Sequence, residues 1–313
     1  ISAYLQRCLG YCSLFLLLLR YSTSDLLDRK VFEMKRKQLT KLGRWIGFAV
    51  VLAFFIAYLF PVIWLFLAGF KSRLDAFATP PAWIFSPTLE HFKEIFKGSG
   101  SSEFFSHLLN SFIVTAVTTA ISMAVACYAG YSLARIRPRG SGVIGLIILG
   151  ARLFPPVSLL VPLFVIFQRL GILDTRLALI LPYTALNIPL ATMMMRGFYL
   201  DLPKDLEDAA FVDGCNRWSA FHRIIMPLVT PALTATAVFS FILAWNDLLF
   251  AVSFTTFEAP TLPILVSRVR TEEGIRWGLL GALSLLVTIP TGIYTFRVQK
   301  WLVKGLASGA VKG

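Results

Sequence analysis

The chain has 313 residues, of which 57% are hydrophobic and only 15% are charged, and it carries a formal net charge of +13. Soluble domains carry about 25% charged residues, and the apolar residues here form long blocks, which excludes an ordinary soluble domain. A basic chain can bind nucleic acid, but these Lys and Arg residues lie between apolar blocks, where they set membrane topology. We therefore expect a membrane protein that binds no nucleic acid.

The N-terminal segment differs from the rest of the chain. The short apolar run Leu14–Leu19 is similar to the core of a signal peptide but has no small-residue cleavage site after it. A new basic segment begins at Met34, directly before the first long apolar block. We expect residues 1–33 to be an extension outside the fold and residues 34–313 to form the transmembrane domain.

Six apolar blocks follow, each long enough to cross a hydrocarbon core of about 30 Å as a helix. They are expected at Ile46–Phe70, Ser111–Leu133, Val143–Phe167, Leu177–Tyr199, Ala232–Phe254 and Trp277–Val298. Prolines in the third and fourth blocks predict kinks inside a bundle, because a carbonyl freed by proline needs a neighbouring partner. The fold class is therefore all-α, a polytopic membrane helix bundle with six core transmembrane helices.

The loops between these blocks indicate an orientation. With six spans both termini lie on one side, and that side carries about twice as many Lys and Arg residues as the other. The positive-inside rule then places both termini in the cytoplasm of a cell whose inner membrane the chain crosses several times.

The cytoplasmic loop between the fourth and fifth blocks, residues 200–231, is longer than a turn and predicts a helix–turn–helix. Pro203 suits a first helical turn, and acidic residues follow it where the helix dipole favours them. Gly214 is a typical helix end, Asn216 is a typical cap of a second helix, and Pro227 is expected to end that helix.

Helical spacing predicts which side chains of this loop gather on one face. In the first helix these are Leu206, Ala209, Ala210 and Asp213; in the second they are Trp218, Phe221, Ile224 and Ile225. On this physical basis alone, a helix pair lying at the membrane interface is as good an interpretation as a functional loop.

The loop resembles the "EAA" loop of permease subunits of binding-protein-dependent ABC importers. The matching residues are Asp208-Ala209-Ala210, Asp213-Gly214 and Met226-Pro227-Leu228. Asp208 stands where the family usually has Glu, so Glu207 is an alternative in register, and Cys215 stands where Ala is usual.

Four further motifs follow the same family in the same order, and the resemblance covers roughly Trp45 to Gly313. They are Asn110-Ser111 with Ala129–Arg135, Leu170–Thr175, Ala244-Trp245-Asn246-Asp247, and a tail that contains Val303–Leu306 and Gly309–Gly313. The last two are similar to the carbohydrate branch of the family.

The resemblance implies a type I ABC importer permease fold and a function in moving a sugar or polyol. It implies four kinds of partner: a second permease subunit, a dimer of ATP-binding subunits, an extracytoplasmic solute-binding protein and membrane lipid. It also implies which residues couple the chain to the ATPase, namely Asp208, Ala209, Ala210, Asp213, Gly214 and Pro227.

Polar side chains inside apolar blocks are costly and therefore informative. They are Arg152, Asn187, Asn246 and Asp247, with Trp245 beside the last two. One interpretation is that they form hydrogen bonds between helices, or that Arg152 pairs with Asp247. The other is that some line a translocation path, since an indole face with amide and carboxylate groups suits a sugar.

The sequence lacks the motifs of nucleotide-binding and metal-binding sites. There is no G-x-x-x-x-G-K-[ST] phosphate loop, and the three His residues are scattered without metal-ligand spacing. We expect no metal, no cofactor and no catalytic residue. The alternatives from other classes are a membrane-embedded lipid-modifying enzyme, which would need a catalytic set at the interface, and a passive channel, which would need no coupling loop.

Overall fold

The structure is a computed structural model that describes residues 41–97, 99–271 and 274–310. The chain divides into two compact units, residues 1–63 and 64–313. The extension expected at residues 1–33 lies outside the described residues. In the first unit, the described residues belong to α3 (Lys41–Ala68), a helix that also runs into the second unit. Its sequence is apolar around the whole circumference, as is typical of a membrane span.

Four long helices make up most of the second unit: α6 (Ser99–Tyr131), α9 (Arg176–Asp201), α12 (Met226–Trp245) and α15 (Trp277–Ala310). The shorter helices are α4 (Arg73–Ala76), α5 (Glu90–Phe96), α7 (Ser141–Leu153), α8 (Leu160–Arg169), α10 (Asp205–Val212), α11 (Arg217–Ala220), α13 (Leu249–Phe254) and α14 (Leu262–Ser267). A 3-10 turn, η2 (Pro156–Leu159), and two π-helical turns, η1 (Ser132–Ile136) and η3 (Phe221–Ile225), connect some of them. The strands β1 (Arg270–Thr271) and β2 (Gly274–Ile275) pair antiparallel, with Arg270 opposite Ile275.

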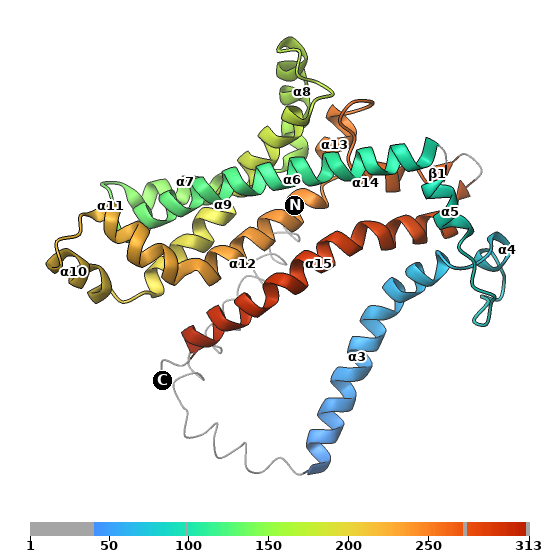
Figure 1. Cartoon of the computed structure of the whole chain (residues 1–313), viewed down its shortest axis with the longest axis horizontal. Coiled ribbons are helices and arrows are strands. Elements are labelled where there is room, and N and C mark those ends of the chain that lie inside the picture. The colour runs from blue at the N-terminus through green and yellow to red at the C-terminus, as the bar shows by residue number, and fades with distance from the viewer. Residues whose placement is uncertain (1–40, 98, 272–273, 311–313) are drawn as a thin grey trace, which may run out of the picture. The chain divides into compact units, whose positions relative to one another are not determined.

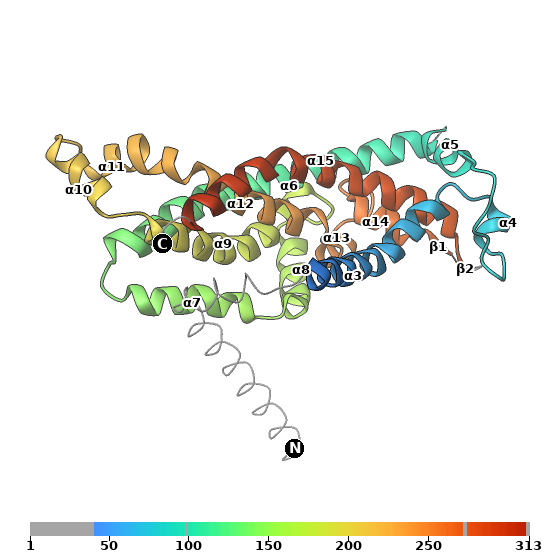
Figure 2. The ribbon, with the colours of Figure 1, turned by 90° about the horizontal axis from the view of Figure 1, so that it is seen from below.

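Within this unit α6, α9, α12 and α15 lie side by side, with α10 and α11 at one end and α4, α5 and β1 at the other (Figures 1 and 2). The most extensive packing is between α6 and α9. Their backbones approach closely at Gly130, where an added Cβ would lie 2.9 Å from the Met195 Cβ and 3.0 Å from the Arg196 nitrogen. Glycine at this position therefore allows the two helices to pack in contact.

The predicted all-α class is confirmed. In the part of the chain that the structure describes, five helical segments are long and apolar enough to cross a membrane: Ile46–Ala68, Gly100–Ile136, Arg176–Asp201, Arg217–Trp245 and Trp277–Val298. The bend predicted for the third block is present and is sharp: Ser141–Leu153 and Pro156–Arg169 are two helices that meet at 88°, and they make a sixth span if the bent pair crosses the membrane once. Phe154 and Pro155 between them are extended, as expected for a residue before proline and for a proline that ends a helix.

The fifth block differs from the prediction. Its helix begins at Arg217 and ends at Trp245, and a break at residues 246–248 separates it from α13. Pro227 does not end a helix as expected; it lies at the start of α12, directly after the π-helical turn η3, and the helical stretch continues through it. The loop predicted at residues 200–231 is therefore shorter than expected.

Two loops at the end opposite α10 are joined through Asp174. Its carboxylate accepts hydrogen bonds from the backbone N–H groups of Thr256, Phe257 and Glu258, at 2.7–3.2 Å. The Asp174 N–H in turn donates to the Phe254 oxygen at 2.8 Å. The segment before α9 and the segment after α13 are thus held together by hydrogen bonds in both directions.

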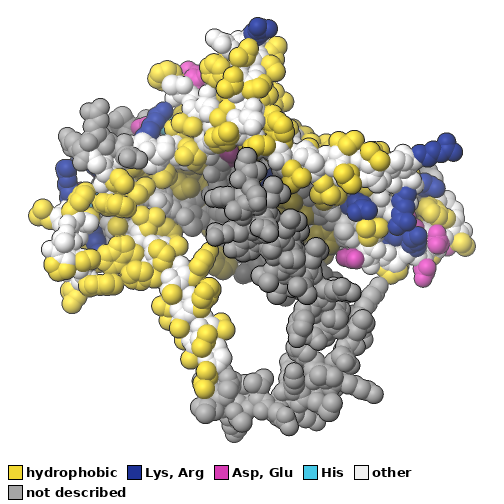
Figure 3. Space-filling model, turned by 180° about the vertical axis from the view of Figure 1, so that it is seen from behind, with side chains coloured by type: hydrophobic (Ala, Val, Ile, Leu, Met, Phe, Trp, Pro, Cys, Tyr) yellow, Lys and Arg dark blue, Asp and Glu magenta, His cyan; other side chains and the backbone are white. Residues whose placement is uncertain are grey.

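On the face seen in Figure 3, Lys and Arg side chains gather at the right-hand end, where α10 and α11 lie, and much of the remaining described surface is hydrophobic. The buried core consists of three clusters, one of them at the α10 end around Tyr131, Tyr199, Phe221 and Ile225. The α10 end of this face is therefore rich in positive charge.

Candidate functional site

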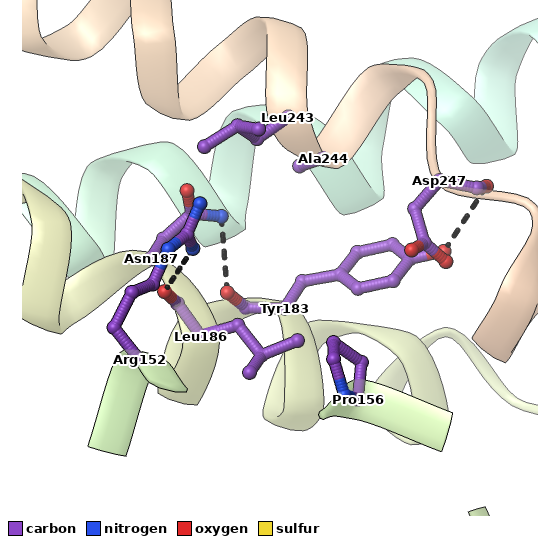
Figure 4. Close-up of a pocket in the computed structure, with 8 residues that line it drawn as sticks. All are labelled: Arg152, Pro156, Tyr183, Leu186, Asn187, Leu243, Ala244 and Asp247. Atoms are coloured by element: carbon purple, nitrogen blue, oxygen red, sulfur yellow. Dashed lines mark hydrogen bonds between the residues drawn. The ribbon is translucent and has the colours of Figure 1, made fainter. Parts of the chain in front are cut away.

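A cavity of about 320 Å³ lies where α7, α9 and the end of α12 meet. Its lining residues are Arg152, Pro156, Tyr183, Leu186, Asn187, Leu243, Ala244 and Asp247 (Figure 4). Three of the five residues predicted for the translocation path, Arg152, Asn187 and Asp247, are therefore brought together at one cavity.

Arg152 and Asn187 lie next to each other at one side of this cavity (Figure 4). The Arg152 Nη1 donates to the Leu186 backbone oxygen at 2.9 Å, which uses one of its five N–H donors. The Asn187 Nδ2 donates to the Tyr183 oxygen of its own helix at 3.0 Å. The Asn187 Oδ1 is buried and has no hydrogen-bond partner in the described part of the chain. This side of the cavity thus offers a free acceptor beside a cation.

Asp247 and Tyr183 lie at the other side (Figure 4). Asp247 stands in the break after α12, where its Oδ1 accepts a 3.1 Å hydrogen bond from the Phe250 N–H at the start of α13. The Tyr183 hydroxyl donates to the Asp247 backbone oxygen at 3.5 Å. Asp247 is not ion-paired with Arg152; the ion pairs among the described residues are Arg135–Glu207, Arg268–Glu103 and Arg276–Glu94.

The structure does not bring Trp245 and Asn246 into the cavity. Trp245 is 1% exposed, stacks on Phe241 and donates from its Nε1 to the Val287 oxygen at 3.3 Å, so it packs against α15. Asn246 donates to the Ile242 oxygen of its own helix at 2.9 Å. Trp245 thus follows the interpretation in which an intramembrane polar group bonds to a neighbouring helix, whereas Asn246 is exposed and bonds to its own helix.

Sequence reasoning missed Tyr183, an aromatic side chain in the cavity. A signal for it was available, because Tyr183 precedes Asn187 by four residues and both therefore share a face of α9. Leu186 and Leu243 had no comparable signal, since they resemble any other apolar residue of a span.

The predicted helix–turn–helix is present at the opposite end of α9 as α10, α11 and η3. Gly214 has φ +84° and makes the turn, and the Asn216 Oδ1 accepts from the Ser219 N–H at 2.8 Å, which caps α11. Asp208 and Ala209 are exposed on α10, as are Asp213 and Gly214 after it. These four predicted coupling residues therefore share an accessible surface.

The inner face of α10 differs from the predicted one. Glu207 and Ala210 are buried, whereas Leu206, Ala209 and Asp213 are exposed. The Glu207 Oε1 lies 2.9 Å from the Arg135 Nε of η1, and the Tyr131 hydroxyl donates to the Glu207 Oε2 at 3.3 Å. Glu207 therefore points inward and Asp208 outward.

We call this helix–turn–helix, formed by α10, α11 and η3, the hairpin. Its second half packs on the bundle through part of its predicted face. Phe221 and Ile225 are buried, in line with the spacing, whereas Trp218 is 65% exposed. Trp218 stacks in parallel on Tyr128 of α6 at 5.7 Å instead of entering the core.

Metal binding has no candidate here. Among residues 41–97, 99–271 and 274–310, no group of three or more His, Cys, Asp and Glu side chains is placed to hold a metal ion.

Comparison with known proteins gives a consistent result. Residues 122–308 match the family model described as "Binding-protein-dependent transport system inner membrane component". The chain is 42% identical over 268 residues to the probable ABC transporter permease protein y4oR of Sinorhizobium fredii, covering 86% of this chain and 95% of that one.

Two further relatives have names that state a solute. The trehalose/maltose transport system permease protein MalG of Thermococcus litoralis is 35% identical, over 90% of this chain and all of its own. The sulfoquinovosyl glycerol transport system permease protein SmoH of Agrobacterium fabrum is 33% identical, over 87% and 95%. Among solved structures, a chain of a bacterial ABC transporter for import of the acidic polysaccharide alginate matches with a TM-score of 0.66 and 23% identity, covering 83% of this chain and 98% of that one.

Proposed function

Because this chain belongs to the family of binding-protein-dependent transport system inner membrane components, we propose that it is the permease subunit of an ABC importer for a sugar or polyol. It is a transport permease of the inner membrane and not an enzyme. The observation that carries the proposal is the family match together with relatives that transport carbohydrates by name. Neither supports a lipid-modifying enzyme or a passive channel.

The solute path runs past the cavity of Arg152, Asn187 and Asp247. Two breaks in helices support this assignment: the right-angle bend after α7 and the break at residues 246–248 both border the cavity. Irregular backbone at membrane depth is tolerated where it is buried in protein or lines a water-filled space. Transporters commonly form solute sites from such discontinuous helices.

The chemistry of the cavity suits a polyhydroxylated solute. The guanidinium, the amide and the carboxylate supply donors and acceptors for hydroxyl groups. The ring of Tyr183 adds an aromatic surface between them (Figure 4). A neutral sugar can use all of these groups without bringing a charge into the membrane, and the carbohydrates in the names of the relatives agree with this choice.

The hairpin of α10 and α11 couples the chain to the ATPase. Asp208, Ala209, Asp213 and Gly214 form its accessible surface, Ala210 packs inward, and Pro227 begins the helix that leads back to the cavity. Small side chains allow another protein to approach closely. The match to importer permeases supports an ATPase and a solute-binding protein as partners, and a second permease subunit completes the assembly.

The hairpin end faces the cytoplasm, as do both termini. The basic residues at that end support this orientation through the positive-inside rule. The α4, α5 and β1 end then faces the solute-binding protein.

Co-purification of the ATPase, followed by solute-stimulated ATP hydrolysis across a panel of sugars and polyols, tests the function. The expected result is a stable complex whose ATP hydrolysis rises with the solute-binding protein and at least one sugar. A permease that purifies without any ATPase, from cells that contain the whole system, would contradict the proposal.

A further inference from the structure

The hairpin is connected to the bundle through a buried ion pair. Glu207 of α10 and Arg135 of η1 approach to 2.9 Å, with side chains only 10% and 5% exposed. These two atoms, Oε1 and Nε, have no hydrogen-bond partner besides this ion pair in the described part of the chain. The charge of each residue is therefore compensated mainly by the other.

Arg135 also connects the pair to two long helices. It lies in the π-helical turn that continues α6, and its Nη2 donates to the backbone oxygen of Leu202, just past the end of α9, at 2.6 Å. The Tyr131 hydroxyl adds a second contact from α6 to the Glu207 carboxylate. One guanidinium thus joins α6, α9 and α10.

The ring of Tyr131 holds this junction in a rigid aromatic setting. It packs against Phe221 of η3 at 4.6 Å and against Tyr199 of α9 at 5.6 Å. Both halves of the hairpin are therefore tied to the end of α6, α10 through Glu207 and η3 through Phe221.

A buried pair responds to displacement differently from a surface pair. Separating Glu207 from Arg135 would leave two uncompensated charges away from water, which is strongly unfavourable. The Arg276–Glu94 pair at the other end of the bundle is also short, at 2.7 Å, but its side chains are 43% and 45% exposed, so water can replace either partner. A hairpin that is pushed by a partner must therefore carry the end of α6 with it.

We propose that the Glu207–Arg135 pair is the rigid link through which movement of the α10–α11 hairpin reaches α6, so that both are positioning residues for coupling. The inference rests on the proposed function, in which the ATPase binds the hairpin. It assigns separate roles to two neighbouring acidic residues: Asp208 lies on the surface that contacts the ATPase, and Glu207 transmits movement of the hairpin to α6.

The experiment measures whether α6 and α10 move together. Spin labels are placed at Ile121 of α6 and Val212 of α10, which are 42% and 88% exposed. The permease is assembled with its partner subunits, and the distance between the labels is measured without nucleotide and after trapping with MgATP and vanadate. We expect the same distance distribution in both states for the otherwise unchanged protein.

The variant Glu207→Gln removes the charge and keeps the shape of the side chain. We expect it to retain the ATPase but to show a broadened or shifted distribution after trapping, on the order of 1–2 Å, the size of typical helix shifts. The exchange Arg135→Glu with Glu207→Arg should restore the single distribution. The matched control, Glu94→Gln, removes an exposed ion pair and should behave as the unchanged protein.

Each outcome decides the matter. An unchanged distribution in Glu207→Gln, or a double variant that behaves like the single one, overturns the link. If Glu207→Gln does not assemble, Glu207→Asp, which keeps the charge but shortens the reach to Arg135, must show the shift instead, and an unchanged distribution there overturns the link. Loss of the ATPase from the unchanged permease would contradict the proposed function, a result that these variants cannot mimic.

Discussion

At the scale of single residues, Asn187 is a side chain whose hydrogen-bonding capacity the protein leaves partly unused. Its amide nitrogen bonds to its own helix, whereas its buried oxygen has no partner in the described part of the chain. A buried acceptor without a partner is costly. A solute hydroxyl in the cavity would supply the missing donor, and binding of a solute would then explain why this oxygen has no partner within the protein.

We predict that Asn187→Leu lowers solute uptake about tenfold, since one hydrogen bond contributes about 1 kcal/mol or more. Assembly with the ATPase should be unchanged, because leucine is of similar size. The measurement is uptake of the solute identified in the sugar panel, with complex recovery measured in parallel. Thr192→Val is the control: it removes a different buried polar atom without a partner, the Thr192 hydroxyl, which is also on α9 but does not line the cavity. Equal uptake in the two variants would refute a role in the solute path.

Asp174 allows a pH prediction. Burial would raise the pKa of its carboxyl, but hydrogen bonds from the backbone N–H groups of residues 256–259 lower it, and the net shift is downward. A carboxyl whose pKa is lower in the folded state stabilises that state above its unfolded pKa, near 3.9, and stops doing so as the pH falls through the folded pKa.

We therefore expect Asp174→Asn to lower the melting temperature of the purified protein equally at pH 7 and pH 5. The difference from the unchanged protein should narrow below about pH 4, where the native carboxylate becomes protonated. Thermal unfolding in detergent at these pH values gives the answer. A difference that already disappears between pH 7 and pH 5 would show that the loop connection does not depend on this carboxylate.

At the scale of elements, the hairpin depends on Gly214. Its φ of +84° lies in the left-handed region, and no atom lies within 4 Å of the position of an added Cβ. A side chain there would be opposed by backbone strain alone, which costs about 1–2 kcal/mol.

We predict that Gly214→Val reduces retention of the ATPase and solute uptake several-fold while the permease still inserts into the membrane. Gly197→Val is the control, because Gly197 of α9 has equally free space and an ordinary helical backbone. Retention is measured by co-purification and uptake in the same cells. Wild-type values for both in Gly214→Val would remove the hairpin from the coupling role.

The elements show how far a sequence predicts this protein. Long apolar blocks determine where helices cross the membrane, so five spans and the hairpin were predictable. The break at residues 246–248 was not, because the residues on either side are as apolar as the helix itself and periodicity does not change there. Prolines marked the bend at Pro155, but a proline indicates where a helix can bend and not by how much.

The sequence predicted which type of side chain lines the candidate site, but it identified only some of the lining residues. Polar side chains within apolar blocks pointed to Arg152, Asn187 and Asp247, because a polar group inside the membrane is energetically costly and is therefore commonly functional. The same signal pointed to Trp245 and Asn246, which the bundle uses for its own hydrogen bonds. Composition does not tell whether a polar side chain faces the cavity or a neighbouring helix, because that depends on how its own helix is rotated about its axis.

At the scale of the whole molecule, the orientation in the membrane can be tested with two equally accessible positions. Leu74 and Val212 are 85% and 88% exposed and lie at opposite ends of the bundle. In a variant without native cysteines, we predict that Leu74→Cys reacts with a membrane-impermeant thiol reagent applied outside the inner membrane. Val212→Cys should react only after the membrane is permeabilised. Reaction of Val212→Cys from outside would reverse the assigned topology.

The cavity and the hairpin share α9 but no side chain. The cavity uses Tyr183 and Asn187 from the first half of this helix, whereas the hairpin junction uses Tyr199 near its end and the Leu202 oxygen beyond it. Under the proposed function, substitutions that change the preferred solute can therefore accumulate during evolution without altering the surface that contacts the ATPase. Related permeases could in this way diverge in the solutes they transport while they keep the same ATPase subunit.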